Sequence, residues 1–266
     1  MLKKYILQKP RSPDDFKDSI KLYIVGIPID YSYENQTRII EFKNILERAK
    51  SDVWPVYISS PPAYFRYLTP DGWKTIEETG VPITYIYTSI EKIRFIKYYL
   101  LTNKLFEIAI SSNVPIVLLR PGSPRVGDSL VKFLIKKFQN RQDKVEMLDV
   151  KSGVDIVGDL AEKAIGKYNL SRQYISAQNL FYRREISKIQ GGDMLLIHCL
   201  SSNYIYRNKP FFGKVVTRLF QLGLGDKLAY IKSPKTEGIL MTVKKLSKRL
   251  YQFNQNDHYT LVIIQK

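Results

Sequence analysis

The sequence is poor in the residues that build redox centres and zinc sites. Among its 266 residues are one cysteine, Cys199, and two histidines, His198 and His258. A single cysteine excludes an internal disulfide and a cysteine-rich zinc site. Cys199 lies in the apolar run MLLIHCL, which favours a buried and inert thiol. Two scattered histidines give little support to a metal site.

Long hydrophobic runs and the common nucleotide-binding motifs are also missing. No apolar run approaches the roughly 20 residues that cross a bilayer, and the charged, proline-containing start MLKKYILQKPRSPDDFKD has no apolar signal-peptide region. We therefore expect a cytoplasmic protein without membrane contact. Neither G-x-G-x-x-G nor a Walker lysine pattern occurs, and no serine lies in G-x-S-x-G.

Positive charge is what the sequence has in excess. The chain carries 42 Lys and Arg residues against 25 Asp and Glu, a formal net charge of +17. Such a field attracts anions and speeds encounters with acidic partners without naming them. Nucleic acid and an acidic peptide are two candidates, but we favour an ordinary solvated surface because the cations are spread out. They recur in three stretches: Lys132, Lys136, Lys137 and Arg141; Arg207, Lys209, Lys214 and Arg218; and Lys244, Lys245, Lys248 and Arg249.

The central stretch of the chain predicts an α/β fold. Residues 114–119 form a short apolar run, a tight Pro-Gly-Ser-Pro turn and a helical pattern follow, and residues 145–150 are apolar again. This order of strand, loop, helix and strand is typical of parallel strands covered on both faces. Ligands bind outside the carboxyl ends of such strands. The loops at residues 120–126 and 149–155 are therefore the candidate site.

Strand and helix patterns extend on both sides of this stretch. Before it, the spacing of apolar residues predicts strands at 21–29, 53–59 and 82–87 and helices at 37–50, 63–68 and 89–112. After it, a helix is predicted at 152–165, then a turn-rich patch at 166–169, strands at 172–177, 194–200, 227–231, 239–243 and 259–264, and a helix at 214–222. Short strands with few helices indicate a mixed sheet. We expect a polar leader at 1–20, an N-terminal lobe with a parallel sheet at 21–167 and a C-terminal lobe with a mixed sheet at 168–266.

Several loop motifs occur in an order that resembles a known family. YIVG at residues 23–26 resembles an opening strand and glycine turn, RPGSPRV at 120–126 a G-[DH]-P loop, and residues 148–155 a P-G-[VI]-S-x-x-D segment. This order resembles the class III S-adenosylmethionine-dependent methyltransferases, the tetrapyrrole methylase family. Within it the sequence is most similar to the borosin-type peptide backbone N-methyltransferases and to the methylase-like domains fused to MazG-type pyrophosphohydrolases. The resemblance covers the chain from about Lys21 to Ile264.

This resemblance implies a two-lobed tetrapyrrole methylase fold, a homodimer, and S-adenosyl-L-methionine in the cleft between the lobes. The first loop has Gly-Ile-Pro-Ile where the family has a second glycine, and residues 149–151 replace Pro-Gly-Val. Losing these glycines restricts the backbone angles available there. The implied cofactor-binding residues are Gly26, Pro28, Pro121, Gly122, Ser123, Pro124, Val126, Ser152, Ala177, Gln178, Leu200 and Ser233.

The borosin-type branch carries an arginine and tyrosines near the methyl donor, and three residues here resemble them. Arg94 and Tyr98 are four apart on a predicted helix, which places them on one face, and Tyr85 lies in the preceding strand. The resemblance implies Tyr98 as the base for an amide proton, Arg94 as the charge that stabilises the phenolate and a developing imidate, and Tyr85 as a positioning group. With 19 tyrosines in the chain, however, such a pair also arises by chance.

The expected function is methyl transfer from S-adenosyl-L-methionine to the backbone amide of a separate precursor peptide, with a small molecule as the second choice of acceptor. The sequence ends at its last predicted strand, so we expect no substrate peptide within it. The alternative is a non-catalytic protein of this fold that binds nucleic acid or an acidic partner through its basic surface. Steep salt dependence of nucleic-acid binding favours that alternative.

Overall fold

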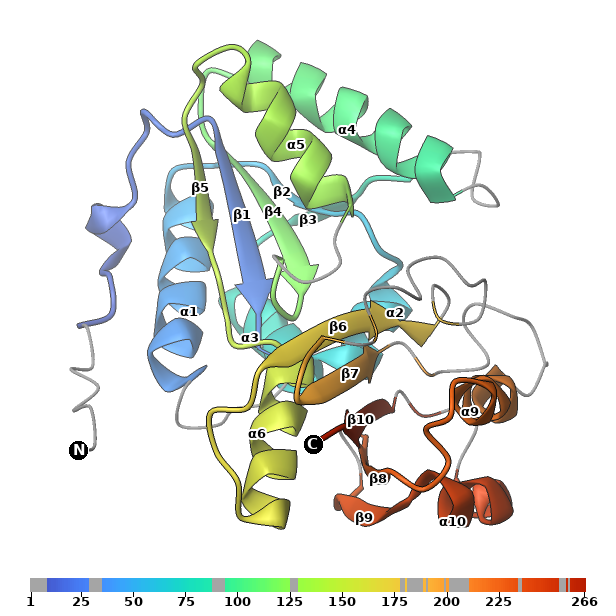
Figure 1. The fold of residues 1–266 in the computed structure, drawn as a ribbon. Coiled ribbons are helices and arrows are strands. Elements are labelled where there is room, and N and C mark those ends of the chain that lie inside the picture. The colour runs from blue at the N-terminus through green and yellow to red at the C-terminus, as the bar shows by residue number, and fades with distance from the viewer. Residues whose placement is uncertain are drawn as a thin grey trace. The chain divides into compact units, whose positions relative to one another are not determined.

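Two compact α/β units make up the chain in the computed structural model (Figure 1). They comprise Met1–Gly153 and Val154–Lys266, so the division falls one helix before the turn-rich patch expected as the boundary. Each unit contains one five-stranded sheet. The structure describes residues 9–28, 35–87, 94–124, 129–177, 180, 189, 191–198, 200, 211–233, 236–253, 257 and 259–266.

The first unit is built on a parallel sheet with the strand order β3-β2-β4-β1-β5. Its strands are β1 (Leu22–Ile27), β2 (Val56–Ile58), β3 (Ile83–Tyr85), β4 (Ile116–Pro121) and β5 (Val145–Leu148). Every neighbouring pair is parallel, which confirms the prediction and places all five carboxyl ends at one edge. The two strands of the central stretch at residues 114–150 are β4 and β5, and both pair with β1.

Helices cover both faces of this sheet because its strands bury alternate side chains on opposite sides. Tyr23 and Val25 belong to one hydrophobic cluster, whereas Leu22 and Ile24 belong to the other. The first cluster includes side chains of α1 (Gln36–Ser51), α2 (Pro62–Leu68) and α3 (Pro70–Thr79). The second includes side chains of α4 (Arg94–Ser111) and α5 (Ser129–Gln139), which lie together in Figure 1.

Helix α3 has no counterpart among the predicted elements. It buries only Gly72, Ile76 and Thr79, which is too sparse an apolar pattern to mark a helix. Its ends nevertheless follow from local chemistry. Pro70 occupies the first turn, where no intrahelical partner is lost, and Gly80 (φ 64°) follows the helix in the left-handed conformation.

Residues 9–20, predicted as part of a polar leader, pack against the first unit. The buried ring of Phe16 meets the ring of Tyr23 edge-on at 5.8 Å, and Tyr23 stacks on Trp54 at 5.7 Å. The backbone N–H of Lys17 donates to the Tyr23 hydroxyl at 2.7 Å, and that hydroxyl donates back to the Lys17 carbonyl at 3.1 Å. This segment therefore contributes to the hydrophobic core of the unit.

The second unit contains a mixed sheet with the strand order β6-β7-β10-β8-β9. β6 and β7 are parallel, whereas β10 runs antiparallel to both β7 and β8, and β9 antiparallel to β8. The predicted mixture of directions is thus confirmed, and the carboxyl ends of β6, β7 and β8 share one edge. The strands are β6 (Arg172–Ser176), β7 (Met194–His198), β8 (Leu228–Lys232), β9 (Ile239–Thr242) and β10 (Thr260–Ile264).

Helices also cover both faces of the second sheet. α6 (Gly153–Ile165) packs Val157 and Ala161 into a cluster with Met194 and Leu196, and for this reason it belongs to the second unit. The opposite face is covered by α9 (Phe211–Gln221), α10 (Val243–Lys248) and the short 3-10 helix η4 (Leu250–Gln252). Helix α10, like α3, is not predicted from the sequence, since it buries only Val243 and Leu246.

Arg172 links β6 to three turns of α6. Its guanidinium donates to Asp159 at 2.6 Å and to the carbonyl of Asp155 at 3.1 Å, and it forms an ion pair with Glu162 at 3.1 Å. Burial opposes the charge, but the hydrogen bonds to Asp159 and Glu162 outweigh it and raise the pKa of Arg172. Gly158 allows the approach, because a Cβ there would lie 3.0 Å from a guanidinium nitrogen of Arg172.

Candidate functional site

Three loops meet at the carboxyl edge of the first sheet, around Gly26. A Cβ at this position would lie 2.9 Å from the Gly122 carbonyl oxygen, 2.9 Å from Pro124 Cδ and 3.1 Å from Val150 Cγ2. These atoms belong to the loops that follow β4 and β5. No side chain fits at residue 26 unless one of the loops moves, and this explains the glycine.

Gly122 closes the junction from the side of β4. Its N–H donates to the Ile27 carbonyl at 2.7 Å, forming an isolated bridge between the ends of β1 and β4. Its φ of 70° lies in the left-handed region that favours glycine. The Pro-Gly-Ser-Pro turn therefore folds back onto the first loop through its backbone.

Hydrogen bonds hold the loop after β5 in the same junction. The Asp149 carboxylate accepts from the Ser123 hydroxyl at 2.6 Å and from the Val150 N–H at 3.0 Å. The N–H of Lys151 donates at 2.9 Å to the side-chain oxygen of Asn35, which is fully buried at the start of α1. These hydrogen bonds hold the loop after β5 in its conformation through contacts within the protein alone.

Asn35 and Arg120 are polar residues at this edge that the list of predicted cofactor-binding residues leaves out, although Arg120 begins one of the predicted loops. Asparagine directly before a helix is a common N-cap signal, but its actual contact is with Lys151, far along the chain. The Arg120 guanidinium donates to the hydroxyl of Ser59, which joins the ends of β4 and β2. Together with Asp149, Arg120 brings one charge of each sign to the edge, both half-buried.

The predicted cofactor residues of the second unit also lie at one strand edge. Ala177 follows β6, Leu200 follows β7 and Ser233 follows β8, and these strands point the same way. The exposed fractions of the three residues are 0%, 2% and 2%. The Leu200 N–H donates to the Tyr259 carbonyl at 3.4 Å, and the Ser233 N–H donates to the Thr236 hydroxyl at 3.2 Å.

The structure thus brings most of the predicted cofactor residues together within their own units. Val126 and Gln178 lie outside the described residues. At the carboxyl edge of the first sheet lie Gly26, Pro28, Pro121, Gly122, Ser123, Pro124 and Ser152. Their role in binding a cofactor stays a prediction.

The two predicted catalytic tyrosines pack into clusters on opposite faces of the first sheet. Tyr85 ends β3 and packs into the cluster of α1, α2 and α3, with its ring stacked 5.9 Å from that of Tyr87. Tyr98 packs into the cluster of α4 and α5. Arg94 begins α4, and its side chain lies outside the described residues. The catalytic roles of the three residues therefore stay predictions.

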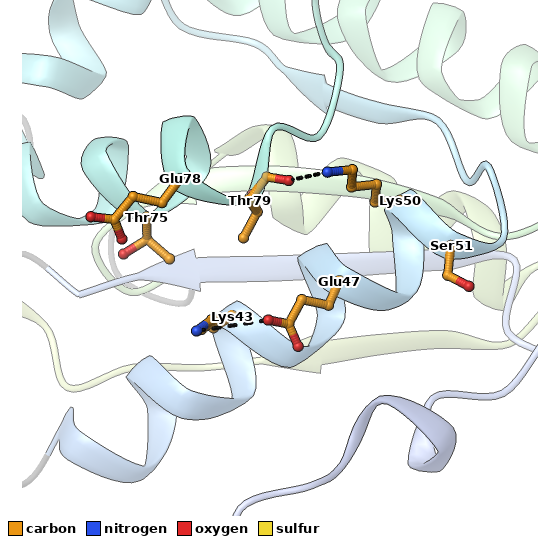
Figure 2. Close-up of a pocket in the computed structure, with 7 residues that line it drawn as sticks. All are labelled: Lys43, Glu47, Lys50, Ser51, Thr75, Glu78 and Thr79. Carbon is orange, nitrogen blue, oxygen red and sulfur yellow. Dashed lines mark hydrogen bonds and ion pairs between the residues drawn. The ribbon is translucent and has the colours of Figure 1, made fainter.

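A polar hollow of about 560 Å³ lies elsewhere in the first unit, between α1 and α3 (Figure 2). Its lining comes from residues 43–51 of α1 and 75–79 of α3, and both helices end toward the amino ends of the strands, away from the loop junction. Lys43 pairs with Glu47 at 3.8 Å, and Lys50 donates to the Thr79 carbonyl at 2.7 Å, which caps α3. None of the residues that line this hollow is among the predicted site residues.

Across the parts of the chain that the structure describes, no three His, Cys, Asp or Glu side chains gather as a metal site would require. Within the same residues, no helix has the length and apolar character needed to span a membrane.

Comparison with known protein structures identifies the fold. No protein-family profile and no curated protein sequence matches the chain. Its structure is similar to that of cobalt precorrin-4 methyltransferase, a cobalamin biosynthetic enzyme, with 12% identity and a TM-score of 0.55 over 91% of this chain and 93% of that one. It is also similar to uroporphyrin-III C-methyltransferase from Thermus thermophilus, with 13% identity and a TM-score of 0.57 over 91% and 93% of the two chains.

Diphthine synthase is a third similar structure, with 15% identity and a TM-score of 0.55 over 92% of this chain and 90% of that one. At these identities the similarity shows the fold alone. The chain therefore has the two-unit tetrapyrrole methylase fold that its motif order predicts, with a parallel sheet in the first unit and a mixed sheet in the second.

Proposed function

We propose that this chain is an S-adenosylmethionine-dependent methyltransferase of class III. The observation that carries the proposal is the loop junction at the carboxyl edge of the first sheet, where Gly26 leaves no room for a side chain and Gly122 folds back onto β1. Parallel α/β sheets bind ligands at this edge. The similar structures named above are methyltransferases or a synthase of the same fold, which supports the class.

The residues of the junction fit the chemistry of S-adenosyl-L-methionine. The donor carries an ammonium and a carboxylate on its amino-acid part, and Asp149 and Arg120 offer the opposite charges at this edge. Backbone groups of the loops after β1, β4 and β5 would supply the remaining polar contacts. When bound, the donor supplies an electrophilic methyl group, and the protein's task is to bind, orient and shield it from water. We predict separately that Ala177, Leu200 and Ser233 contribute to cofactor binding. Measuring the affinity of the Ser233→Ala variant for S-adenosyl-L-methionine tests this prediction.

The acceptor we propose is a backbone amide of a separate, acidic peptide. The resemblance to the borosin-type enzymes and the net charge of +17 support this choice. The amide nitrogen would lose its proton to the phenolate of Tyr98 and form a bond to the methyl carbon while the carbon–sulfur bond breaks. Arg94 would stabilise the developing imidate. The products would be the N-methylated peptide and S-adenosylhomocysteine.

Calorimetric titration with S-adenosylmethionine and S-adenosylhomocysteine tests the proposed class. We expect wild-type protein to bind both with dissociation constants of about 1 μM to 1 mM. Gly26→Ala should weaken binding more than about tenfold and cost about 2 kcal/mol of unfolding free energy, because the new methyl overlaps a backbone oxygen of the adjacent loop. The absence of binding to the wild type would overturn the proposal and leave the non-catalytic alternative.

Gly213→Ala is the matched control for this substitution. Its Cβ would lie 3.7 Å from Leu250 Cδ1, an ordinary contact, and it replaces a glycine in α9. We expect binding to be unchanged and stability to rise by up to about 1 kcal/mol. Equal losses of binding in both variants would remove the loop junction as the site.

Transfer of a radioactive methyl group tests the acceptor separately. Label from methyl-tritiated S-adenosylmethionine should enter an acidic peptide and survive hydrolysis as N-methyl amino acid. Tyr98→Phe should abolish the transfer while leaving cofactor affinity unchanged. Cofactor binding together with label appearing only in a small molecule would contradict the peptide proposal and leave the methyltransferase class standing.

A further inference from the structure

One outer surface of the second unit is rich in positively charged side chains. We call it the α9–α10 surface and define it by the exposed or half-buried side chains of Lys214, Arg218, Lys244, Lys245, Lys248, Arg249 and Tyr251. No Asp or Glu occurs in residues 194–225 or 238–256 of the sequence. The surface therefore has cations but no carboxylates from its own segments.

The fold forces these cations outward. α9 buries Phe212, Val215, Val216 and Leu219, and α10 buries Val243 and Leu246, all in one cluster against the sheet. The two helices also pack against each other, as Figure 1 shows. The polar sides of both helices remain exposed or half-buried, and they carry the cations of this surface.

The densest part of this face is the run from residue 244 to residue 249. Lys244, Lys245 and Lys248 share one side of α10, and Arg249 follows directly. Among the described residues, no carboxylate pairs with any of these four cations, although ion pairs are common elsewhere in the chain, as at Arg172. Four adjacent positive charges without a counter-ion repel one another, and this repulsion is relieved when a polyanion binds.

An exposed aromatic side chain follows these cations closely in the sequence. Tyr251 in η4 is 81% exposed, the second-highest exposure among the large hydrophobic and aromatic side chains of the described residues. Phe220 of α9 is 40% exposed. An exposed ring beside a row of cations matches the two contacts made to single-stranded nucleic acid, namely charge to the phosphates and stacking to an unpaired base.

We propose that the α9–α10 surface binds single-stranded nucleic acid. A membrane surface fits less well, since the apolar sides of both helices are buried against the sheet and cannot insert into lipid. An acidic peptide would satisfy the charges but leave the exposed ring of Tyr251 without a flat partner. This binding is independent of the proposed methyl transfer and uses the second unit alone.

Fluorescence anisotropy with a labelled oligouridylate of about 12 nucleotides tests the proposal on the full-length protein. The variant combines Lys244→Ala, Lys245→Ala, Lys248→Ala and Arg249→Ala, because alanine preserves the helix. Its matched control combines Lys132→Ala, Lys136→Ala, Arg141→Ala and Lys144→Ala, which remove four exposed cations from α5 and the loop after it. Both variants lower the net charge equally, so only the position of the charges differs.

We expect wild-type affinity to fall steeply between about 50 mM and 200 mM salt, with the four cations contributing about 3 units of the log–log slope. The α10 variant should bind about tenfold or more weakly at low salt and lose that part of the slope, whereas the control should stay within about twofold. Equal weakening of both variants would assign the binding to the overall charge and overturn the proposal. The same conclusion would follow if neither variant changed it.

Tyr251 separates single-stranded nucleic acid from other polyanions. Tyr251→Ala should weaken oligouridylate binding about tenfold, and Tyr251→Phe should restore it, because stacking needs the ring and not the hydroxyl. A single-stranded DNA of equal length should behave in the same way. If polyglutamate or vesicles containing phosphatidylserine bind more tightly than the oligonucleotide and Tyr251→Ala has no effect, the partner is not a nucleic acid.

Discussion

The two sheets secure their ends by different means. At the carboxyl edge of the first sheet, loops interlock through backbone contacts around Gly26 and Gly122, and the buried amide of Asn35 holds the loop after β5. In the second unit, charged side chains bind the elements: Arg172 ties α6 to β6, and Asp193 ties β7 to the residue before β6.

This difference matters for function. A junction held by close backbone contacts and short polar side chains has a fixed shape and little net charge of its own, so it suits close recognition of a small ligand. Ionic clusters stabilise a unit while its outer cations remain available for a flexible polyanion. The loop junction of the first unit is therefore expected to respond to changes of shape, and the contacts of Arg172 and Asp193 in the second unit to changes of charge and pH.

Replacing Arg172 should have the largest effect on stability. Arg172→Met leaves Glu162, with its buried carboxylate, without a counter-charge, at a cost of about 3 kcal/mol in the unfolding free energy of the second unit. We place the cost at the low end of the range for buried pairs because the Arg172 side chain is 18% exposed. Denaturant unfolding measures it, and adding Glu162→Gln should recover part of the loss. A loss below about 0.5 kcal/mol would class the cluster with ordinary surface ion pairs.

Asn35 should show the opposite pattern, in which shape matters more than charge. Asn35→Ala leaves the Lys151 N–H without its acceptor and should cost about 2 kcal/mol, together with weaker binding of S-adenosylmethionine. Asn35→Asp keeps an acceptor oxygen at the same place and should retain more of the affinity than the alanine variant. If Asn35→Ala lowered stability but left affinity unchanged, the loop after β5 would not form part of the site.

The charged second unit should also respond to acid through Asp193. Hydrogen bonds from the Ser171 hydroxyl and N–H, with Lys266 nearby, lower the pKa of this carboxyl from 3.8 to about 2. A lowered pKa means that the stabilisation is complete above pH 3.8 and is lost as the pH falls through about 2. Carboxyl titration by NMR should show the midpoint near 2 in the wild type. Ser171→Ala should shift it upward, and an unshifted midpoint would contradict the assigned cause.

Much of the fold could be predicted because apolar runs mark buried strands whatever their partners are. All ten strands named here match predicted runs, and the parallel and mixed character of the sheets followed from the helices between them. Helices α3 and α10 were missed because each buries few large apolar side chains. Sequence order alone also does not show which sheet α6 packs against.

The candidate site was only partly predictable. Motif order placed Gly26 and Gly122 in two loops of the implied cofactor site, but the 2.9 Å approach that makes Gly26 necessary depends on how loops distant in sequence fold together. The contact of Asn35 with Lys151 has the same origin. Tyr85 was grouped with Arg94 and Tyr98 from the family resemblance and from spacing along the chain. Spacing does not report that Tyr85 packs into the cluster of α1, α2 and α3 and Tyr98 into that of α4 and α5.

Hydrogen exchange measured by mass spectrometry, with and without S-adenosylmethionine, tests the central claim most directly. The account predicts slower exchange in peptides that contain residues 120–124 and 149–153, with no change in the helices that line the hollow between α1 and α3. Protection at that hollow, or no protection anywhere at saturating ligand, would contradict the assignment of the loop junction as the cofactor site.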